Sequence, residues 1–273
     1  MSTPSPQLAS HAEPLDAAAL AAAGYVAVVH LPEADSTMVE ARRLAADPAR
    51  RLPAVVIADR QTSGRGRRGA GWWQADGSLA ASVVVDGQAV GLNATSPRPA
   101  WSLACGIALA ETIRAHETAI DVRIKWPNDL EVAGRKLAGI IVESDSGGGT
   151  IFGIGVNTAG SAQAAPAGLR ERIITLPDLV GRPLSRTHLL AGFLPRLRQL
   201  LRAMDADPGT LAARYVPLCG LAGRTLLLHV GAEQHAGICR GIAADGSLVI
   251  DTPAGRRSFA SGSLTPPGSE WRP

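Results

Sequence analysis

Between residues 99 and 156 the chain changes from one long helix-like segment to three closely spaced strand-like runs. Apolar residues recur at helical spacing from Pro99 to His116. The runs 122–126, 137–143 and 150–156 are short and apolar, and turn-forming residues separate them. Such a helix must bury its apolar face on the sheet that these strands build. We therefore expect an α+β fold, a mixed β-sheet flanked by helices, with the helices on one face.

The segments before and after this region extend the same pattern. An Ala-rich helix is expected over 16–23, where Gly24 stops it, and a second helix begins after Asp35, because Thr37 and Glu40 have the spacing of a capping box. The other expected elements are strands over 25–31, 54–58 and 79–85 and helices over 189–201 and 210–215.

The pattern of residues changes at Cys219, where short apolar runs separated by glycine begin. These runs cover 225–230, 236–242, 248–251 and 258–260, and their spacing predicts a small all-β barrel or sandwich. We therefore expect a large domain over 15–218 and a small β domain over 219–266. The Pro-rich residues 1–14 are expected to be a disordered leader, and 267–273 a tail.

Bulk composition excludes several classes of function. The formal net charge is only +3, from 27 basic and 24 acidic residues, so no basic field for nonspecific nucleic-acid binding is implied. Cys105, Cys219 and Cys239 lie far apart, which argues against a disulfide framework or a zinc site. No apolar run is long enough for a membrane span, and the six histidines have no metal-ligand spacing. We expect a cytoplasmic protein that binds neither DNA nor membrane.

Lysine is almost absent, and its two positions are informative. Of the 27 basic residues, only Lys125 and Lys136 are lysines, and they share one short segment. Arg-biased codon usage explains why lysine is rare, but not why both lysines lie together. An ammonium is a compact point charge, whereas a guanidinium is a planar fork, so this segment is a candidate site for a single anionic oxygen.

A glycine- and arginine-rich loop, 61–73, directly follows the expected strand 54–58. Its glycines allow backbone N–H groups to approach an anion, and its arginines suit phosphate or carboxylate oxygens. It lacks the pattern of a phosphate-binding Walker loop or of a dinucleotide fingerprint. A flexible basic surface loop is the plain alternative. The adjacent Trp72 and Trp73 favour function, because an indole beside a phosphate site can stack on a base. We expect the loop to be mobile when empty and to close over its ligand.

Two further motifs follow. Lys125-Trp126-Pro127-Asn128-Asp129-Leu130 places polar groups at a turn after a strand, although Pro-Asn-Asp is also an ordinary turn sequence. Lys136 lies in an apolar strand, where a cation is costly to bury without an anion, so we expect it to face a ligand. Gly139, three residues later, would allow another group to approach closely.

In the order and approximate spacing of four sequence motifs, the chain resembles the biotin protein ligases. The motifs are the loop 61–73, Lys-Trp-Pro-Asn-Asp-Leu, Arg135-Lys136-Leu-Ala-Gly-Ile and Gly153-Ile-Gly-Val-Asn157. The resemblance covers about 33–160 closely and extends to the C-terminal β module. It implies a class II synthetase-like catalytic fold over 15–218 with a small SH3-like barrel. It also implies an ATP-dependent ligase that forms biotinyl-AMP with Mg²⁺ and transfers biotin to a lysine of a biotin carboxyl carrier domain of an acyl-CoA carboxylase.

The resemblance also assigns roles to individual residues. Ser36, Thr37, Gln61 and Gly139 would line the biotin pocket, although Ser36 and Thr37 are also natural helix-capping residues. Gly64, Arg65 and Arg67 would hold the biotin carboxylate and the adenylate phosphate, and Lys136 would bridge the two. Trp72 would stack on adenine, and Lys125, Asn128 and Asn157 would contact phosphate or adenosine. No metal ligand is expected from side chains beyond the Mg²⁺ that accompanies ATP.

The chain departs from the family at two positions, and other classes stay open. Met38 stands where relatives often have Asn, and Ala70 where many have Arg, so a biotin contact and a phosphate contact are in question. A lipoate or octanoate ligase would share the fold but have a different glycine-rich signature. A thiol-dependent acyl transferase would need a cysteine beside Lys136. A DNA-binding repressor would need an extra domain before Ser36. We expect a monofunctional enzyme that is a monomer or weak homodimer.

Overall fold

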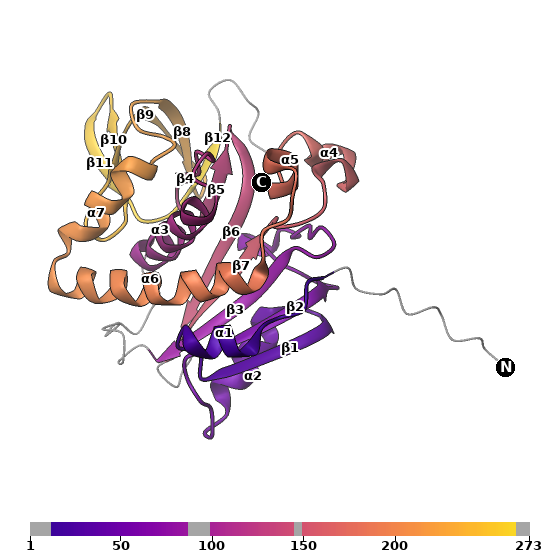
Figure 1. The fold of residues 1–273 in the computed structure, drawn as a ribbon. Helices are drawn as coiled ribbons and strands as arrows, with labels where there is room; N and C mark the ends of the chain where they lie inside the picture. The colour runs from indigo at the N-terminus through magenta and orange to yellow at the C-terminus, as the bar shows by residue number, and fades with distance from the viewer. Residues whose placement is uncertain (1–11, 87–98, 145–148, 266–273) are drawn as a thin grey trace.

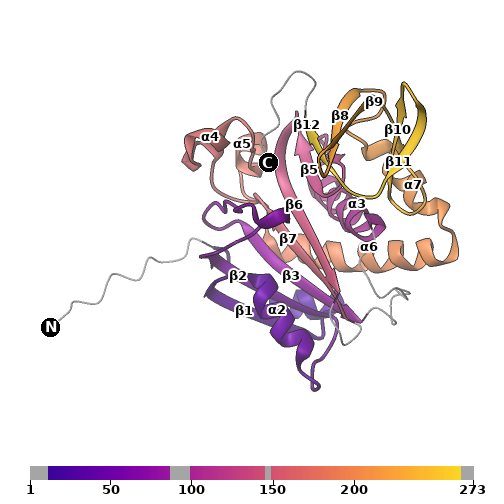
Figure 2. The same cartoon turned by 180° about the vertical axis from the view of Figure 1, so that it is seen from behind.

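The computed structural model describes residues 12–86, 99–144 and 149–265, which form two β-sheets with helices around them (Figures 1 and 2). The large sheet has seven strands in the order β1-β2-β3-β7-β6-β5-β4. Only β1 and β2 pair in parallel, so the predicted mixed sheet is confirmed. The strands are β1 Ala27–Ala34, β2 Ala54–Gln61, β3 Leu79–Asp86, β4 Arg123–Lys125, β5 Asp129–Val132, β6 Arg135–Ser144 and β7 Gly149–Val156.

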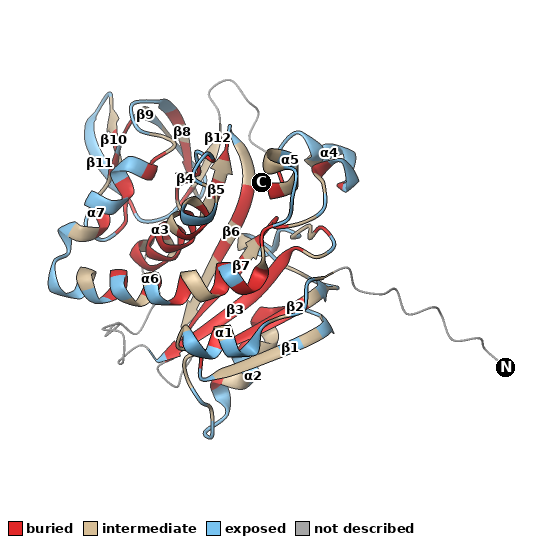
Figure 3. Ribbon diagram, viewed as in Figure 1, coloured by how far each residue is buried: buried red, intermediate tan, exposed pale blue. Residues whose placement is uncertain are grey.

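Alternating residues of the central strands face two different hydrophobic clusters. Val55 and Val83 belong to the main cluster, to which the long helices α3 (Pro99–His116) and α6 (Arg186–Ala206) contribute. Val56 and Val84 face a smaller cluster beneath α2 (Thr37–Ala46). The prediction that the helices lie on one face is therefore wrong. Figure 3 shows the buried strands between these layers.

Helix α2 covers only part of its face, and this leaves room for a site. It contacts β2, β3 and β7 through small apolar residues such as Ala41 and Ala45. Its N-cap is Ser36, whose side chain accepts a hydrogen bond from the backbone N–H of Met38. The predicted capping box at Thr37 is not formed, because the Thr37 hydroxyl instead donates to Gln61.

Most predicted elements are present, and the additional ones are short. The remaining helices are α1 Ala17–Ala22, α4 Ala167–Arg170, α5 Leu176–Val180 and α7 Gly209–Tyr215. The sequence did not predict α4, α5 or β5, because each spans only four or five residues and shows no clear period. None of the helices within the described ranges is long and apolar enough to cross a membrane.

The C-terminal strands form an antiparallel sheet in the order β11-β10-β9-β8-β12. These strands are β8 Thr225–Val230, β9 Glu233–Ile242, β10 Leu248–Thr252, β11 Gly255–Phe259 and β12 Ser263–Thr265. Within residues 219–265 no pairing joins β11 to β12, so the strand pairing alone does not close the expected barrel. Strand β12 was not predicted.

This small sheet shares one hydrophobic cluster with the large sheet. The Trp126 indole N–H donates to the Gly246 carbonyl at 3.0 Å, and Gly246 lies so close that a Cβ there would be 2.4 Å from the Ala100 nitrogen. The division into 15–218 and 219–266 stays a prediction.

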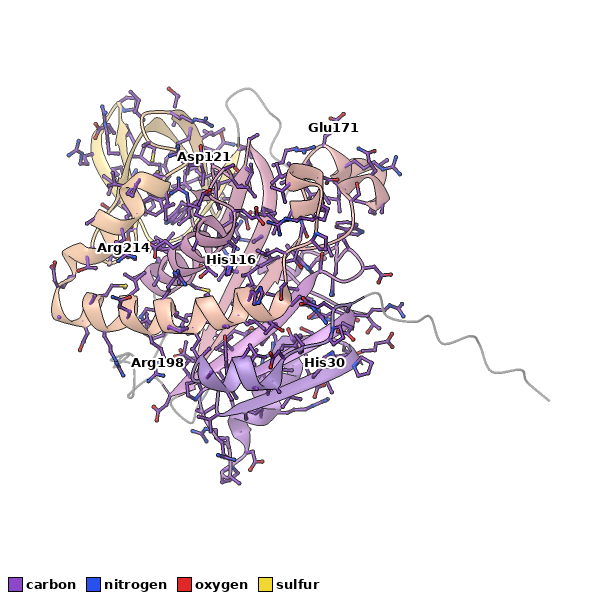
Figure 4. All side chains as sticks on the ribbon, in the orientation of Figure 1. His30, His116, Asp121, Glu171, Arg198 and Arg214 are labelled. Atoms are coloured by element: carbon purple, nitrogen blue, oxygen red, sulfur yellow. The ribbon has the colours of Figure 1, made fainter. Side chains whose placement is uncertain are left out.

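A buried ion pair fixes the N-terminal part of α6. Arg186 is 1% exposed, and its guanidinium lies 2.7 Å from the carboxylate of Asp59, which also contacts His30 of β1 (labelled in Figure 4). Burial opposes ionisation of Asp59, but hydrogen bonds from His30 and Arg186 outweigh it and hold the pKa of this carboxyl below its usual value.

Part of the predicted leader joins this network. The backbone N–H of Arg186 donates to the Glu13 carboxylate at 3.1 Å, because the N-terminus of α6 attracts a carboxylate. The disordered leader over 1–14 stays a prediction. Residues 1–11 and the predicted tail 267–273 lie outside the described residues.

We expect Arg186→Met to lower the free energy of unfolding by about 3–5 kcal/mol, because it leaves the Asp59 carboxylate buried without its main partner. Urea denaturation followed by circular dichroism measures this. The matched control is Arg60→Met, which breaks the exposed pair with Glu33 and should cost less than about 1 kcal/mol. Equal losses in the two variants would contradict a structural role for the buried pair.

Candidate active site

The face of the sheet left open by α2 has a floor of glycine. Gly139 of β6 is paired with Gly155 of β7, and Gly153 lies two residues earlier on β7, on the same face. A Cβ on Gly155 would lie 2.5 Å from the Trp72 ring, and one on Gly139 would lie 3.1 Å from it. The absence of side chains here is therefore what allows an indole to lie flat against the backbone.

A first cavity opens above this floor. Ser36 and Thr37 reach it from the start of α2, and Gln61 from the end of β2. The Gln61 side-chain oxygen accepts from the backbone N–H of Thr37 at 2.9 Å, and Ser82 donates to the Thr37 hydroxyl at 2.9 Å. The cavity is lined by Ser36, Thr37, Met38, Gln61, Arg65, Gly66, Arg67, Trp72, Asn128, Lys136, Gly139, Ile140, Ile141, Gly153, Ile154 and Gly155.

The Gly/Arg loop forms a small hairpin over one end of this cavity. A bridge joins Arg65 to Gly71, and the Gly66 N–H donates to the Ala70 carbonyl. The Arg67 guanidinium donates to the Asn128 side chain at 3.1 Å. Burial, with the neighbouring charge of Arg68, lowers the pKa of Arg67 from its usual value. Loop mobility stays a prediction.

Lys136 lies near the start of β6, and two backbone hydrogen bonds fix its position. Its N–H donates to the Arg172 carbonyl at 2.8 Å, and its carbonyl accepts from Ile174 at 2.9 Å. Its ammonium lies 2.7 Å from the Asp129 carboxylate and 5.4 Å from the centre of the Trp72 ring. The expected cost of placing a cation in this strand is thus offset by the protein's own carboxylate and by an aromatic face.

A second cavity adjoins the first, and Trp72 and Lys136 line both. Its other lining residues are Ala70, Gly71, Trp73, Lys125, Asp129, Glu131, Gly134, Asn157, Leu169, Glu171, Arg172, Ile173, Leu264 and Thr265. Glu171 follows α4, as Figure 4 shows, and Leu264 and Thr265 belong to β12 of the small sheet. Lys125 is paired here with Glu131 at 3.0 Å.

Two buried polar atoms at this junction have no partner within the described residues. They are the indole nitrogen of Trp72 and the side-chain oxygen of Asn157. The amide nitrogen of Asn157 is already used, because it donates to the Ile174 carbonyl at 2.9 Å. Since a buried polar atom without a hydrogen bond is costly, both atoms point to a ligand that supplies the missing partners.

The structure brings most of the predicted site residues together. Nine line the first cavity: Ser36, Thr37, Gln61, Arg65, Arg67, Trp72, Asn128, Lys136 and Gly139. Gly64 lies beside it, since a Cβ there would be 3.0 Å from the Gln61 amide nitrogen. Lys125 and Asn157 line only the second cavity. The two departures, Met38 and Ala70, line the first and second cavity respectively.

Several lining residues were not predicted. Gly153 and Gly155 could have been recognised from the sequence, because glycines at alternate positions of a strand leave one of its faces without side chains. Asp129 and Glu131 are the counterions of the two lysines, and their alternation along β5 would have placed them on one face. Arg172 and β12 had no signal, since they reach the second cavity only through tertiary packing.

The arrangement separates neutral polar groups from positively charged groups along the glycine floor. Ser36, Thr37 and Gln61 line the first cavity from the α2 end, Arg65 and Arg67 line it from the loop, and Lys136 lies where the two cavities meet. Such a site can hold two anions near one another, because the cations offset their repulsion. Within the described ranges no group of three or more His, Cys, Asp or Glu side chains could hold a metal ion.

Comparison with known proteins agrees with this geometry. Residues 37–160 match the model of the biotin/lipoate A/B protein ligase family. The chain is 33% identical over 237 residues to a biotin–[acetyl-CoA-carboxylase] ligase of Paracoccus denitrificans, covering 83% of this chain and 95% of that relative. It is 32% identical over 206 residues to a bifunctional ligase/repressor of Escherichia coli (strain K12), covering 72% of this chain but only 61% of that relative.

A solved structure shares the fold. The biotin protein ligase from Aquifex aeolicus in complex with biotin and ATP superposes with a TM-score of 0.73 at 25% identity, covering 88% of this chain and 98% of the other. Shared sequence over nearly the whole Paracoccus relative, together with this shared fold, places the chain in the biotin protein ligase family, a family of enzymes.

Proposed function

We propose that this chain joins biotin to AMP and then transfers the biotinyl group to a lysine of a carrier domain. The observation that carries the proposal is that Arg65, Arg67 and Lys136 line one cavity and that Lys136 also lines the adjoining second cavity. The Paracoccus relative and the Aquifex structure are named as biotin ligases rather than lipoate ligases, which supports biotin as the substrate.

In the first half-reaction biotin occupies the first cavity and ATP, with its Mg²⁺, enters the second as substrate. The ring of biotin lies toward Ser36, Thr37 and Gln61, and its carboxylate lies toward the cations. A carboxylate oxygen attacks the α-phosphorus, the bond to the bridging oxygen breaks, and pyrophosphate leaves. Lys136 and the arginines stabilise the negative charge that develops on the phosphoryl groups.

In the second half-reaction the neutral amine of a carrier lysine attacks the acyl carbon of biotinyl-AMP. A C–N bond forms, the C–O bond to phosphate breaks, the amine loses a proton, and AMP leaves. The mixed anhydride would react with water, so the loop protects it by covering the junction. The carrier in this proposal is the biotin carboxyl carrier domain of an acyl-CoA carboxylase, which the name of the Paracoccus relative supports, and the proposed compartment is the cytoplasm.

The direct test is exchange of labelled pyrophosphate into ATP with biotin, lipoate or octanoate as the acid. We expect biotin alone to support rapid exchange, because its ring can use the polar groups at the α2 end. Mass spectrometry should then show one biotinyl group added to a purified carrier domain. Exchange that is as fast with lipoate as with biotin would overturn the assignment of substrate.

Lys136→Met should lower kcat for pyrophosphate exchange by about 100- to 1,000-fold, because it removes a donor from the charge that develops in the transition state. The matched control is Arg135→Met, which removes one positive charge from the neighbouring position of β6, a residue that lines neither cavity. A similar loss in both variants would show that net charge, not position, matters.

Arg67→Gly should allow biotinyl-AMP to escape, because Arg67 closes the first cavity from the loop side and contacts Asn128. Biotin should then appear on the lysines of a bystander protein in a streptavidin blot. Labelling of the enzyme itself should stay low, since Lys125 and Lys136 are its only lysines. The control is Arg68→Gly, because Arg68 contacts Ser263 and lies outside both cavities. Label confined to the carrier would refute this role for Arg67.

A further inference from the structure

The first cavity has one wall that none of the assigned roles explains. Met38, in the first turn of α2, lines the cavity beside Ser36 and Thr37 but contributes an apolar thioether there. It is 7% exposed and belongs to the smaller hydrophobic cluster together with Ala41 and Ile151. It therefore closes this end of the cavity against the packed layer beneath α2.

Met38 lies directly over the glycine floor. A Cβ on Gly153 would be 2.5 Å from the Met38 sulfur and 3.0 Å from its Cγ, distances too short for non-bonded atoms. Ile141, the neighbour of Gly153 on β6, lines the same part of the cavity. The Met38 side chain therefore occupies the space that a side chain at position 153 would need.

The floor also gives the direction in which the ligand lies. Gly155 is under Trp72, next to Lys136, whereas Gly153 is one strand repeat farther from the cations. A ligand whose carboxylate is held at Lys136 must extend along β7 toward Gly153, so its far end meets Met38. The distance from the cations to Met38 sets the length of ligand that fits.

We propose that Met38 and Gly153 together set the depth of the acid-binding cavity and so determine which chain length and ring size of acid the enzyme accepts. This inference rests on the proposed function, because it takes biotin as the acid. Met38 acts on specificity through packing, since it offers the ligand no charge and no strong hydrogen-bonding group.

The proposal has a definite energetic consequence. Homobiotin, which has one more methylene in its acyl chain, must push its ring deeper when its carboxylate is held in the same place. One methylene too many or too few in an apolar pocket changes kcat/KM by roughly 10- to 200-fold. Unaltered enzyme should therefore prefer biotin over homobiotin by a factor in this range.

The experiment measures kcat/KM for pyrophosphate exchange with biotin and with homobiotin in unaltered enzyme, Met38→Ala, Gly153→Ala and the double variant. Met38→Ala should reduce the preference for biotin at least about tenfold, because the cavity becomes deeper. Gly153→Ala should raise KM for biotin by about tenfold or more, because the new methyl group forces the thioether into the cavity. Adding Met38→Ala to Gly153→Ala should restore much of this loss.

A control separates specificity from general damage to the fold. Met204→Ala removes the same atoms from α6, where Met204 is partly buried and lines neither cavity. It should leave the preference between the two acids unchanged even if it lowers the melting temperature. Circular dichroism of each variant verifies that it is folded at the assay temperature.

Two results would overturn the inference while leaving the proposed function intact. One is a Met38→Ala enzyme whose preference for biotin stays within about twofold of the unaltered enzyme. The other is a double variant that binds biotin no better than Gly153→Ala alone. If the unaltered enzyme exchanges pyrophosphate with neither acid, the proposed function itself fails.

Discussion

The bare backbone of β6 and β7 is the constraint on which the rest of the site depends. Glycine at 139, 153 and 155 leaves three positions on one face of two paired strands without side chains in the middle of a sheet. Glycine is unfavourable in a strand interior, so this choice costs stability unless something else packs on the exposed backbone. The Trp72 indole and the Met38 thioether do so here, and each lies where a Cβ on the floor would clash. A ligand that replaces or extends these contacts can therefore lie flat against the sheet.

The charges around this floor are balanced within the protein. Lys136 is paired with Asp129, and Lys125 with Glu131, all on the β4–β6 strands. These pairs are half-buried, so each carboxylate reduces the cost of keeping a cation near the sheet when no ligand is bound. Anionic substrates in the proposed reaction would compete with these carboxylates for the ammonium groups. Arg67 differs, because its hydrogen bond goes to the neutral amide of Asn128, and a guanidinium has further N–H groups that can donate to a charged ligand.

Sequence reasoning succeeded where a pattern extends over many residues and failed where packing decides. The helix 99–116 and the central strands were predicted almost to the residue, because apolar residues mark each of them over most of its length. Helix α2 was predicted, but its side of the sheet was not, because tertiary packing decides which face of a sheet a helix covers. The four ordered motifs contain seven of the nine predicted residues that line the first cavity, and the family resemblance added Ser36 and Thr37. They could not indicate that Arg172 and β12 complete the second cavity, since those contacts join segments far apart in sequence.

The shared wall between the two cavities explains why one enzyme can hold both reactants and an unstable product. Trp72 and Lys136 line both cavities, so an acid in one and a nucleotide in the other would meet beside the same ammonium group. The new anhydride bond would then form at the junction rather than after movement of either substrate. Leu264 and Thr265 of β12 line the second cavity, so the small sheet reaches this part of the site. The C-terminal module is therefore part of the wall that separates the proposed intermediate from water.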